Sequence, residues 1–338
     1  MRMRAVVVRK PGELVLEDIP EPEPRDREVL VKVRSASICN AVDRHILEGT
    51  ATGYLDHYPQ ILGHEISGEV VDIGSQVDDV DIGERIVFFK LGGFTEYVAL
   101  DIAEYAFARV PSELSDDEAP LCEMLHGSLI GTVFPAHIKP WERVLIIGQG
   151  PLGLLTLQLV RVLGAEAVSV VDCYKNRVKK SEELGADYAY SYSEQSTDEI
   201  VRMVENDMGL SDLTIMCIDE DLSPTKDVGK LATDTLVHGG RLTGLTVEIQ
   251  KPGPQIDLQA IFQKSLRVSR ELTSIYDHNS LELQKKAWQQ GVNWVREGKI
   301  NMAALVTHHV TLEDVEKGIM LCRDEPETCI KVVVHIGV

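Results

Sequence analysis

The sequence has few aromatic residues, no closely spaced cysteines and no long apolar run. Phe, Trp and Tyr make up 5% of its 338 residues. No apolar run reaches the ~20 residues of a membrane-spanning helix, so we predict that the membrane is not a partner. The six cysteines include no C-x-x-C pair, and such wide spacing in a long chain argues against a disulfide framework.

Positive charge is also scarce. The chain has 34 basic and 54 acidic residues and a formal net charge of −20. Nucleic acids and anionic membranes bind positively charged surfaces, so this balance excludes them as expected partners. The basic start, Met1–Arg4, is followed by an apolar run too short for a signal peptide, which Pro11 and Gly12 end. We therefore predict a first strand there and a cytoplasmic protein.

The length suits two domains, and the hydrophobic pattern changes along the chain. The first part is β-rich, with short β-branched or alternating runs broken by Pro and Gly. The stretch 20–24, Pro-Glu-Pro-Glu-Pro, is expected to be an extended connection. The predicted strands are Ala5–Arg9, Leu14–Asp18, Val29–Ala36, Ser67–Gly74 and Arg85–Phe89.

In the middle of the chain, strands alternate with helices, which indicates a parallel sheet built from βαβ units. The continuous apolar run 144–147 is typical of a strand buried on both faces. An α/β class follows, with a sheet domain over 131–273 inserted between segments 1–130 and 274–338 of a second domain. The other predicted strands are 167–172, 213–218, 241–245, 265–271 and 331–335; the predicted helices are 154–163, 176–184, 281–297 and 312–322.

The loop that follows the buried strand reads Gly148-Gln149-Gly150-Pro151-Leu152-Gly153. This is the G-x-G-x-x-G pattern of dinucleotide-binding folds, here between a strand and a helix. Its glycines permit a tight turn, close approach of the pyrophosphate and close packing of the helix on the strand. The free N–H groups of the helix N-terminus suit the phosphates.

The second strand of this unit ends in Asp172, near the expected ~20 residues beyond the loop. A carboxylate there binds the adenosine ribose and repels a 2′-phosphate, so NAD is predicted over NADP. Lys175 and Arg177 follow closely and leave some tolerance of NADP. We count Arg177 among the cofactor-binding residues, together with the loop and Asp172.

Three further segments carry residues that suit zinc: 37–45, with Cys39, Asp43 and His45; 63–68, with His64 and Glu65; and 121–126, with Cys122 and Glu123. A catalytic zinc has three protein ligands and one open position. Each residue taken alone is better explained by packing or exposure. Their joint occurrence instead favours a zinc site.

The pattern Gly63-His64-Glu65-x-x-Gly68, with Gly74 six residues later, resembles the signature of the zinc-containing medium-chain alcohol dehydrogenases. Cys39 lies where that family has its cysteine ligand, and the resemblance extends over essentially the whole chain. It implies a GroES-like β-rich catalytic domain and a Rossmann domain. It also implies one catalytic zinc, a small-molecule alcohol or ketone substrate, and a homodimer or homotetramer.

By the same resemblance, Cys39 and His64 are zinc ligands, and Glu65 is an exchangeable ligand or a carboxylate beside the site. Glu123-Met124-Leu125 resembles the Glu-Pro-Leu of polyol dehydrogenases, in which the Glu completes the site directly or through water. The alternative third ligand is Cys122, because the alcohol dehydrogenases proper use a cysteine. Catalytic roles are expected for Cys39, His64, Glu65, Asp43 and His45.

The chain departs from the family pattern in two places. The four cysteines of the structural zinc are missing from the region 88–97, which predicts at most one zinc per chain. Ala41 and Val42 stand where relatives carry a hydroxyl for proton transfer. Either a hydroxyl from elsewhere in the chain or Glu65 with a zinc-bound water would then carry the proton. His45 is the expected proton exit, although a structural role for His45 on its loop is as good an interpretation.

These features together predict a zinc-dependent oxidoreductase that transfers a hydride between NAD and a secondary alcohol or ketone. The glutamate Glu123 in the third of these segments favours a polyol, sugar or cyclitol as the substrate. Two alternatives stay open: a metal-free quinone or enoyl reductase of the same superfamily, and a regulatory protein that binds nucleotide without catalysis.

Overall fold

The structure is a computed structural model that describes residues 1–218, 228–244, 256–270 and 281–337. The chain divides into two compact units. The first comprises Met1–His126, His278–Gly298 and Met302–Val338, and the second comprises Gly127–Asp277 and Lys299–Asn301. The boundary proposed at 273/274 lies outside the described residues. None of the described helices is both long and apolar enough to cross a membrane.

The second unit contains a six-stranded parallel sheet with the strand order β11-β10-β9-β12-β13-β14. Counted along the chain from β9, this is the 3-2-1-4-5-6 order of a Rossmann fold. The predicted α/β class is therefore confirmed. The strands are β9 (Arg143–Ile147), β10 (Ala167–Asp172), β11 (Tyr188–Ser191), β12 (Ser211–Met216), β13 (Leu236–Gly244) and β14 (Arg267–Arg270).

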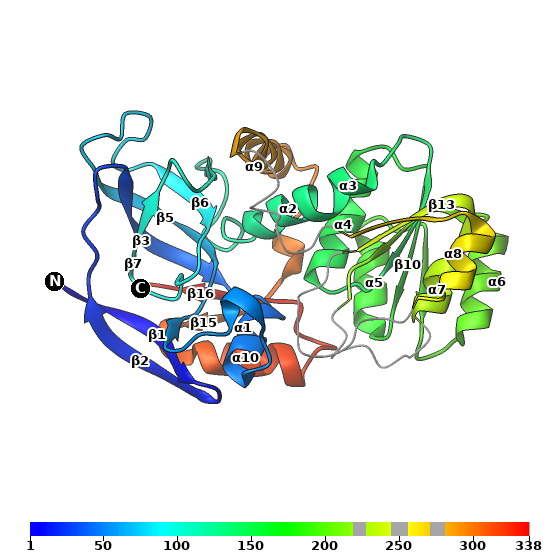
Figure 1. Ribbon diagram of the computed structural model, residues 1–338, viewed down its shortest axis with the longest axis horizontal. Helices are drawn as coiled ribbons and strands as arrows, with labels where there is room; N and C mark the ends of the chain where they lie inside the picture. Colours follow the sequence, from blue (N-terminus) through cyan, green and yellow to red (C-terminus); the bar gives the residue numbers. More distant parts are fainter. Residues whose placement is uncertain (219–227, 245–255, 271–280, 338) are drawn as a thin grey trace. The chain divides into compact units, whose positions relative to one another are not determined.

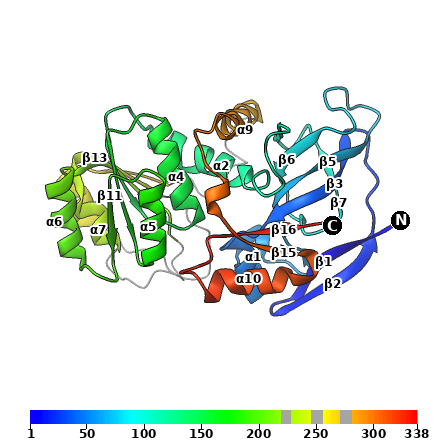
Figure 2. The ribbon, with the colours of Figure 1, turned by 180° about the vertical axis from the view of Figure 1, so that it is seen from behind.

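Helices cover both faces of this sheet, as Figures 1 and 2 show from opposite sides. Alternate residues of β9 explain why both faces are apolar. Val144 and Ile146 pack with Leu157 of α4, whereas Leu145 and Ile147 pack against α6 and α7 on the other face. The helices are α3 (Phe134–Ala136), α4 (Pro151–Val162), α5 (Lys175–Glu183), α6 (Thr197–Asp207), α7 (Val228–Asp234) and α8 (Leu258–Lys264).

The first unit is β-rich and GroES-like. A seven-stranded sheet has the order β15-β16-β3-β5-β6-β8, with β7 paired to β3, and a smaller sheet has the order β2-β1-β4. Most of the apolar side chains of these sheets form one core. The strands are β1 (Arg2–Lys10), β2 (Glu13–Pro20), β3 (Glu28–Ser37), β4 (Gln60–Ile61), β5 (Glu65–Ile73), β6 (Arg85–Phe89), β7 (Tyr97–Asp101), β8 (Phe107–Arg109), β15 (Val306–Thr311) and β16 (Lys331–His335).

Both ends of the chain contribute to this larger sheet. β16 pairs antiparallel with β3 and parallel with β15, so that the red and blue strands lie side by side in Figure 1. The unit's helices are α1 (Val42–Glu48), α2 (Cys122–Ser128), α9 (Leu281–Arg296) and α10 (Val315–Asp324). The sheet thereby brings residues near position 335 next to residues near position 35.

Two differences from the sequence predictions have physical reasons. α4 begins at Pro151 rather than at Leu154, because proline fits the first turn of a helix, where its missing N–H has no partner to lose. The segment 42–48, expected as a loop, forms helix α1 and ends at Gly49 in the left-handed conformation. The ends of the strands predicted at 241–245 and 265–271 lie outside the described residues.

Candidate metal and cofactor sites

The glycine loop connects β9 to α4 in the second unit. Gly148 has φ of +92°, and a Cβ on it would lie 2.4 Å from the carbonyl oxygen of Cys217. A Cβ on Gly153 would lie 1.8 Å from the carbonyl oxygen of Gly148. Gly150 is the N-cap of α4, and Pro151 is in the first turn, while Leu152 packs at the edge of the core. The loop therefore tolerates only glycine at its first and last positions, and it leaves the N-terminus of α4 available to an anion.

Asp172 ends β10 and lies beside this loop. Its Oδ2 accepts a hydrogen bond from the backbone N–H of Gln149 at 2.6 Å, and its Oδ1 accepts one from the N–H of Tyr174 at 2.8 Å. The residue is buried. Each carboxylate oxygen retains a second lone pair, so the carboxylate can still accept a hydrogen bond from a hydroxyl group.

Arg177 and Tyr174 lie on the same side of the loop. The Arg177 guanidinium carbon lies 4.8 Å from the centre of the Tyr174 ring, and Nη1 lies 3.7 Å from the position that a Cβ on Gly150 would take. A positive charge therefore lies at the predicted phosphate loop. Tyr174 was not singled out from the sequence, because an aromatic residue after a strand carries no specific signal.

In the first unit, Cys39, His64 and Glu65 come together. One potential ligand atom from each lies within 4.8 Å of the others. Cys39 follows β3, His64 comes directly before β5, and Glu65 is the first residue of β5, which is the antiparallel neighbour of β3. The signature motif and the distant cysteine are thus brought together by strand pairing. A thiolate, an imidazole and a carboxylate form a donor set that suits zinc.

The electrostatics of His64 also fit a cation. Burial by itself lowers its pKa, but a hydrogen bond and three nearby negative charges raise the pKa to about 10. The hydrogen bond is to Cys39, and the charges are those of Cys39, Asp43 and Glu123. Nδ1 of His64 is buried and has no hydrogen-bond partner among the described residues. The cluster, in which Cys39 is partly buried and the other two residues are buried, therefore has a negative potential that a divalent ion would neutralise.

Asp43 fixes the backbone around this cluster. Its Oδ2 accepts a hydrogen bond from the N–H of Cys39 at 2.8 Å, and its Oδ1 accepts one from Gly63 at 3.1 Å. Asp43 is fully buried, and that burial raises its pKa, although the positive charge of His64 acts in the opposite direction. It thus connects the two segments that carry Cys39 and His64.

Glu65 has a partner that the sequence interpretation missed, Lys331. Lys331 Nζ lies 2.8 Å from Oε1 and 2.7 Å from Oε2 of Glu65, and it also donates a hydrogen bond to the carbonyl oxygen of Ile38 at 2.7 Å. Ser37 Oγ donates to Oε2. The sequence signal for such a partner was a lysine at the start of the apolar strand β16. The contacts favour a carboxylate beside the site over a freely moving ligand.

The two candidates for a third ligand differ in their surroundings. Glu123 is buried near the start of α2, and its charge acts on His64, although it is not one of the three residues within 4.8 Å. The thiol of Cys122 instead lies 3.8 Å from the carbonyl oxygen of Glu118, and burial raises its pKa to about 12. Of the two candidates, Glu123 is therefore the one whose charge acts on His64, from outside the group of three.

His45 lies in helix α1 and is fully buried. Its Nδ1 lies 2.6 Å from Thr50 Oγ1, and its Nε2 lies 3.1 Å from Nη2 of Arg44. Because arginine only donates, Nε2 accepts, and Nδ1 carries the proton that is directed at Thr50. The hydroxyl of Thr50 was not among the site groups predicted from the sequence.

Comparisons with known proteins agree with this architecture. A family profile for the alcohol dehydrogenase GroES-like domain matches residues 25–111. The sorbitol dehydrogenase of Ovis aries is 27% identical over 344 residues, which cover 91% of this chain and 90% of that protein. The L-threonine 3-dehydrogenase of Francisella philomiragia is 26% identical over 351 residues, covering 94% and 95%.

A solved structure from Sinorhizobium meliloti, described as a zinc-binding dehydrogenase bound to NADP, superposes with a TM-score of 0.81. It is 26% identical, and the match covers 99% of both chains. Both units are thus matched by one known protein in the same order. Residues 25–111 thus match the alcohol dehydrogenase GroES-like domain, and over most of its length the chain is similar to sorbitol, L-threonine and zinc-binding dehydrogenases.

Proposed function

We propose that this protein is a zinc-dependent dehydrogenase that transfers a hydride between NAD and a secondary alcohol or ketone. The observation that carries the proposal is the convergence of Cys39, His64 and Glu65 in a cluster with negative potential, in which His64 and Glu65 are buried and Cys39 is partly buried. A quinone or enoyl reductase has no use for these residues together. Their convergence therefore favours metal-assisted chemistry over that alternative.

Zinc, when bound, would supply a Lewis acid for the substrate oxygen, and NAD would supply the hydride acceptor. The chain's own residues would hold these groups. Cys39, His64 and Glu123 would hold the metal, with Asp43 fixing the backbone N–H groups of Cys39 and Gly63. Lys331 would neutralise Glu65, so that the site does not carry one more unpaired carboxylate.

The choice of NAD rests on Asp172. Its buried carboxylate is held beside the loop by two backbone N–H groups and would repel a 2′-phosphate. Arg177 acts in the opposite direction. We expect kcat/KM to be higher with NAD than with NADP, and Asp172→Ser to shift the ratio toward NADP. A native preference for NADP would contradict this argument.

The alcohol proton needs an acceptor, since Ala41 and Val42 carry none. We propose Glu65 or His45, with the proton of His45 passing to Thr50 through Nδ1. His45→Gln should leave zinc content unchanged and move the pH profile of kcat. An unchanged profile would assign the role to Glu65.

The substrate class is proposed from Glu123 and from the similarity to sorbitol dehydrogenases, which are polyol enzymes by name. A polyol, sugar or cyclitol is the first candidate. The decisive experiment combines metal analysis with NADH formation on a panel of polyols, with and without a chelator. Cys39→Ala should abolish activity and the catalytic zinc, whereas the matched Cys122→Ala should retain both.

The same panel separates the alternatives. Full activity of metal-free protein, or activity on quinones or enones alone, would favour a metal-free reductase. Nucleotide binding with no turnover of any substrate would favour a regulatory protein. A cytoplasmic homodimer or homotetramer remains our expectation, and light scattering tests the oligomeric state.

A further inference from the structure

A second group of metal-ligating side chains lies in the first unit, away from the Cys39 cluster. It consists of Asp117, His309 and His335, and potential ligand atoms of all three lie within 4.8 Å of one another. His309 is on β15, His335 ends β16, and Asp117 is in the turn that precedes α2. Lys331, at the other end of β16, contacts Glu65. At ~3.3 Å per residue, roughly 13 Å of strand separates that end from His335.

The geometry follows from strand pairing. β15 and β16 are parallel neighbours, and His309 is paired with Val333. His335, two residues further on, is therefore the diagonal neighbour of His309 on the same face. The two rings lie nearly parallel, with centres 5.5 Å apart and an interplanar angle of 19°. The imidazoles thus face the same carboxylate from one edge of the sheet.

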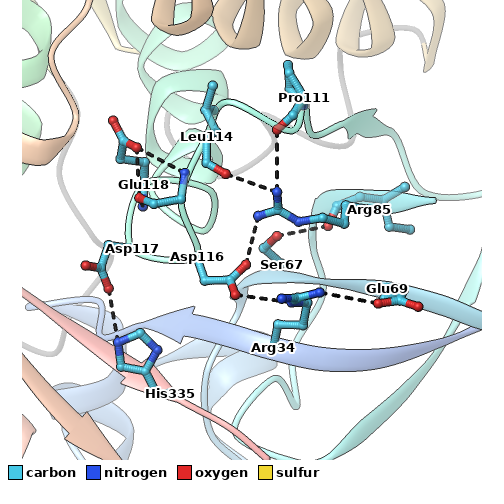
Figure 3. Close-up of polar contacts among 12 residues, drawn as sticks. Arg34, Ser67, Glu69, Arg85, Pro111, Leu114, Asp116, Asp117, Glu118 and His335 are labelled. Atoms are coloured by element: carbon cyan, nitrogen blue, oxygen red, sulfur yellow. Dashed lines mark hydrogen bonds and ion pairs between the residues drawn. The ribbon is translucent and has the colours of Figure 1, made fainter. Parts of the chain in front are cut away.

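Each imidazole contacts a different oxygen of Asp117. His309 Nε2 lies 3.1 Å from Oδ2, and His335 Nε2 lies 3.0 Å from Oδ1 (Figure 3 shows the latter contact). Yet Oδ1 is buried and accepts no hydrogen bond from the described residues. The N–H of His335 is therefore not directed at this oxygen, although the atoms are close enough. Donor atoms that converge without pairing are what a shared cation requires.

The distances also fit an ion. Zinc binds imidazole nitrogen and carboxylate oxygen at ~2.0–2.2 Å. At tetrahedral angles, two such ligand atoms lie roughly 3.4 Å apart, so that the contacts of 3.0 and 3.1 Å need to lengthen by a few tenths of an ångström. The side chains of His309, Asp117 and His335 are 49%, 38% and 31% exposed. The three side chains are therefore partly open to solvent, although Oδ1 of Asp117 is itself buried.

The position of Asp117 is fixed by its neighbour Asp116. Arg85 Nη2 donates to Oδ1 of Asp116 at 2.8 Å, and Arg34 Nε donates to Oδ2 at 3.1 Å. Figure 3 shows Asp116 directed toward both arginines and Asp117 directed toward His335. The guanidinium groups of these two arginines therefore neutralise Asp116. Within the group of Asp117, His309 and His335, the carboxylate of Asp117 faces the two imidazoles.

The other side of the turn is fixed as well. Ser115 N–H and Oγ donate to Oε2 of Glu118 at 3.1 and 2.8 Å, and Glu118 N–H donates back to Ser115 Oγ at 3.3 Å. These reciprocal bonds have the pattern of a capping box, here within a turn. The backbone of Asp117 is thus held on both sides, as a metal ligand supported by its neighbours would be.

We propose that Asp117, His309 and His335 form a second binding site for a divalent transition-metal ion of the zinc class. Two neutral imidazoles and one carboxylate suit zinc, nickel or copper better than magnesium or calcium, which prefer oxygen ligands. The ion would connect the turn before α2 to the C-terminal strands of the same unit. The site replaces our expectation of at most one zinc per chain and is independent of the proposed dehydrogenase activity.

Zinc titration of chelator-treated protein against a competing dye tests the proposal. Native protein should bind two equivalents, and Cys39→Ala should bind one. His309→Asn in the Cys39→Ala background should bind none, or should bind zinc more than about 100-fold more weakly. The matched control is His308→Asn, since His308 is the adjacent histidine on β15 and contacts Thr307 instead.

Thermal melting provides a second readout. Zinc should raise the melting temperature of Cys39→Ala and of its His308→Asn derivative, but not that of its His309→Asn derivative. The proposal is overturned if Cys39→Ala binds no zinc, or if His309→Asn and His308→Asn bind it equally. Loss of zinc from Cys39→Ala with full retention by His309→Asn would overturn the second site while leaving the dehydrogenase proposal intact.

Discussion

Replacing Lys331 with methionine should strongly destabilise the protein. The side chains of Lys331 and Glu65 are only 1% and 2% exposed, and the ammonium lies 2.7 Å from Oε2 of the carboxylate. Burial alone lowers the pKa of Lys331, but the charges of Glu65, Cys39 and Cys322 and the hydrogen bond to Glu65 together raise the pKa above its ordinary value. Lys331→Met keeps the aliphatic volume and leaves Glu65 as a buried charge without its cation.

The magnitude follows from the two opposing terms. At 2.7 Å and an effective dielectric constant of ~20, the attraction is about 6 kcal/mol. Desolvation of both groups offsets part of it, and breaking one side of a buried pair typically costs about 3–5 kcal/mol. With an m-value of roughly 3 kcal/mol/M, the urea midpoint should fall by about 1–2 M.

The assay is urea unfolding of chelator-treated protein, so that bound zinc does not contribute. Glu65→Gln should also be destabilising, since Lys331 then lacks a counter-charge. The double variant Lys331→Met/Glu65→Gln should recover at least half of the summed loss, because no uncompensated charge remains. Lys331→Arg is the control that keeps the charge.

Two results would refute the reasoning. One is a loss below about 1 kcal/mol in Lys331→Met, which is the value of an exposed pair. The other is a double variant whose loss equals the sum of the single losses, because that would mean the two side chains do not interact.

Three further predictions concern the loop, a buried histidine and the metal. Gly153→Ala, whose Cβ would lie 1.8 Å from the oxygen of Gly148, should cost about 1–3 kcal/mol and weaken NADH binding at least tenfold in a fluorescence titration. Gly127→Ala, where a Cβ meets nothing within 4 Å, is its control and should change neither. In the folded protein, burial lowers the pKa of His126 to about 3, whereas in the unfolded chain a histidine has a pKa of about 6.5. Protons therefore bind the unfolded chain first, and the free energy of unfolding decreases as the pH falls from about 6.5 toward 3. At pH 5 the loss of stability is about 2 kcal/mol. His126→Asn should not show this loss, whereas the control His308→Asn should. Equal shifts of the urea midpoint between pH 7 and pH 5 in the two variants would contradict this prediction. Dialysis against a chelator should remove activity, and added zinc should restore it; activity that persists in metal-free protein would argue against a catalytic metal.

Features that depend on local sequence were predictable. The Gly148–Gly153 loop lies between a strand and a helix as expected, because glycine geometry, strand burial and helix start are all set within a few residues. The capping box Ser196–Glu199 at the start of α6 is another pattern that is set within a few residues. The missed helix α1 is short, and its apolar side chains give no periodic pattern over seven residues.

Features that join distant segments were not predictable from the residues alone. Lys331 reads as a surface residue until β16 pairs with β3, which brings it to Glu65. Asp117 and the two histidines likewise meet only because β15 and β16 lie at the edge of the larger sheet. A sequence motif records spacing along the chain, whereas these contacts depend on which strands become neighbours.

The sequence by itself therefore determined the α/β class, and it predicted a candidate cofactor loop and candidate zinc ligands. It did so because glycine, buried strands and the zinc signature are local patterns with a physical reason for each residue. The tertiary structure decided how those ligands are supported, that His45 is buried against Thr50, and that a second group of ligands exists. These depend on long-range pairing and burial, which set the charge and solvent exposure of each side chain.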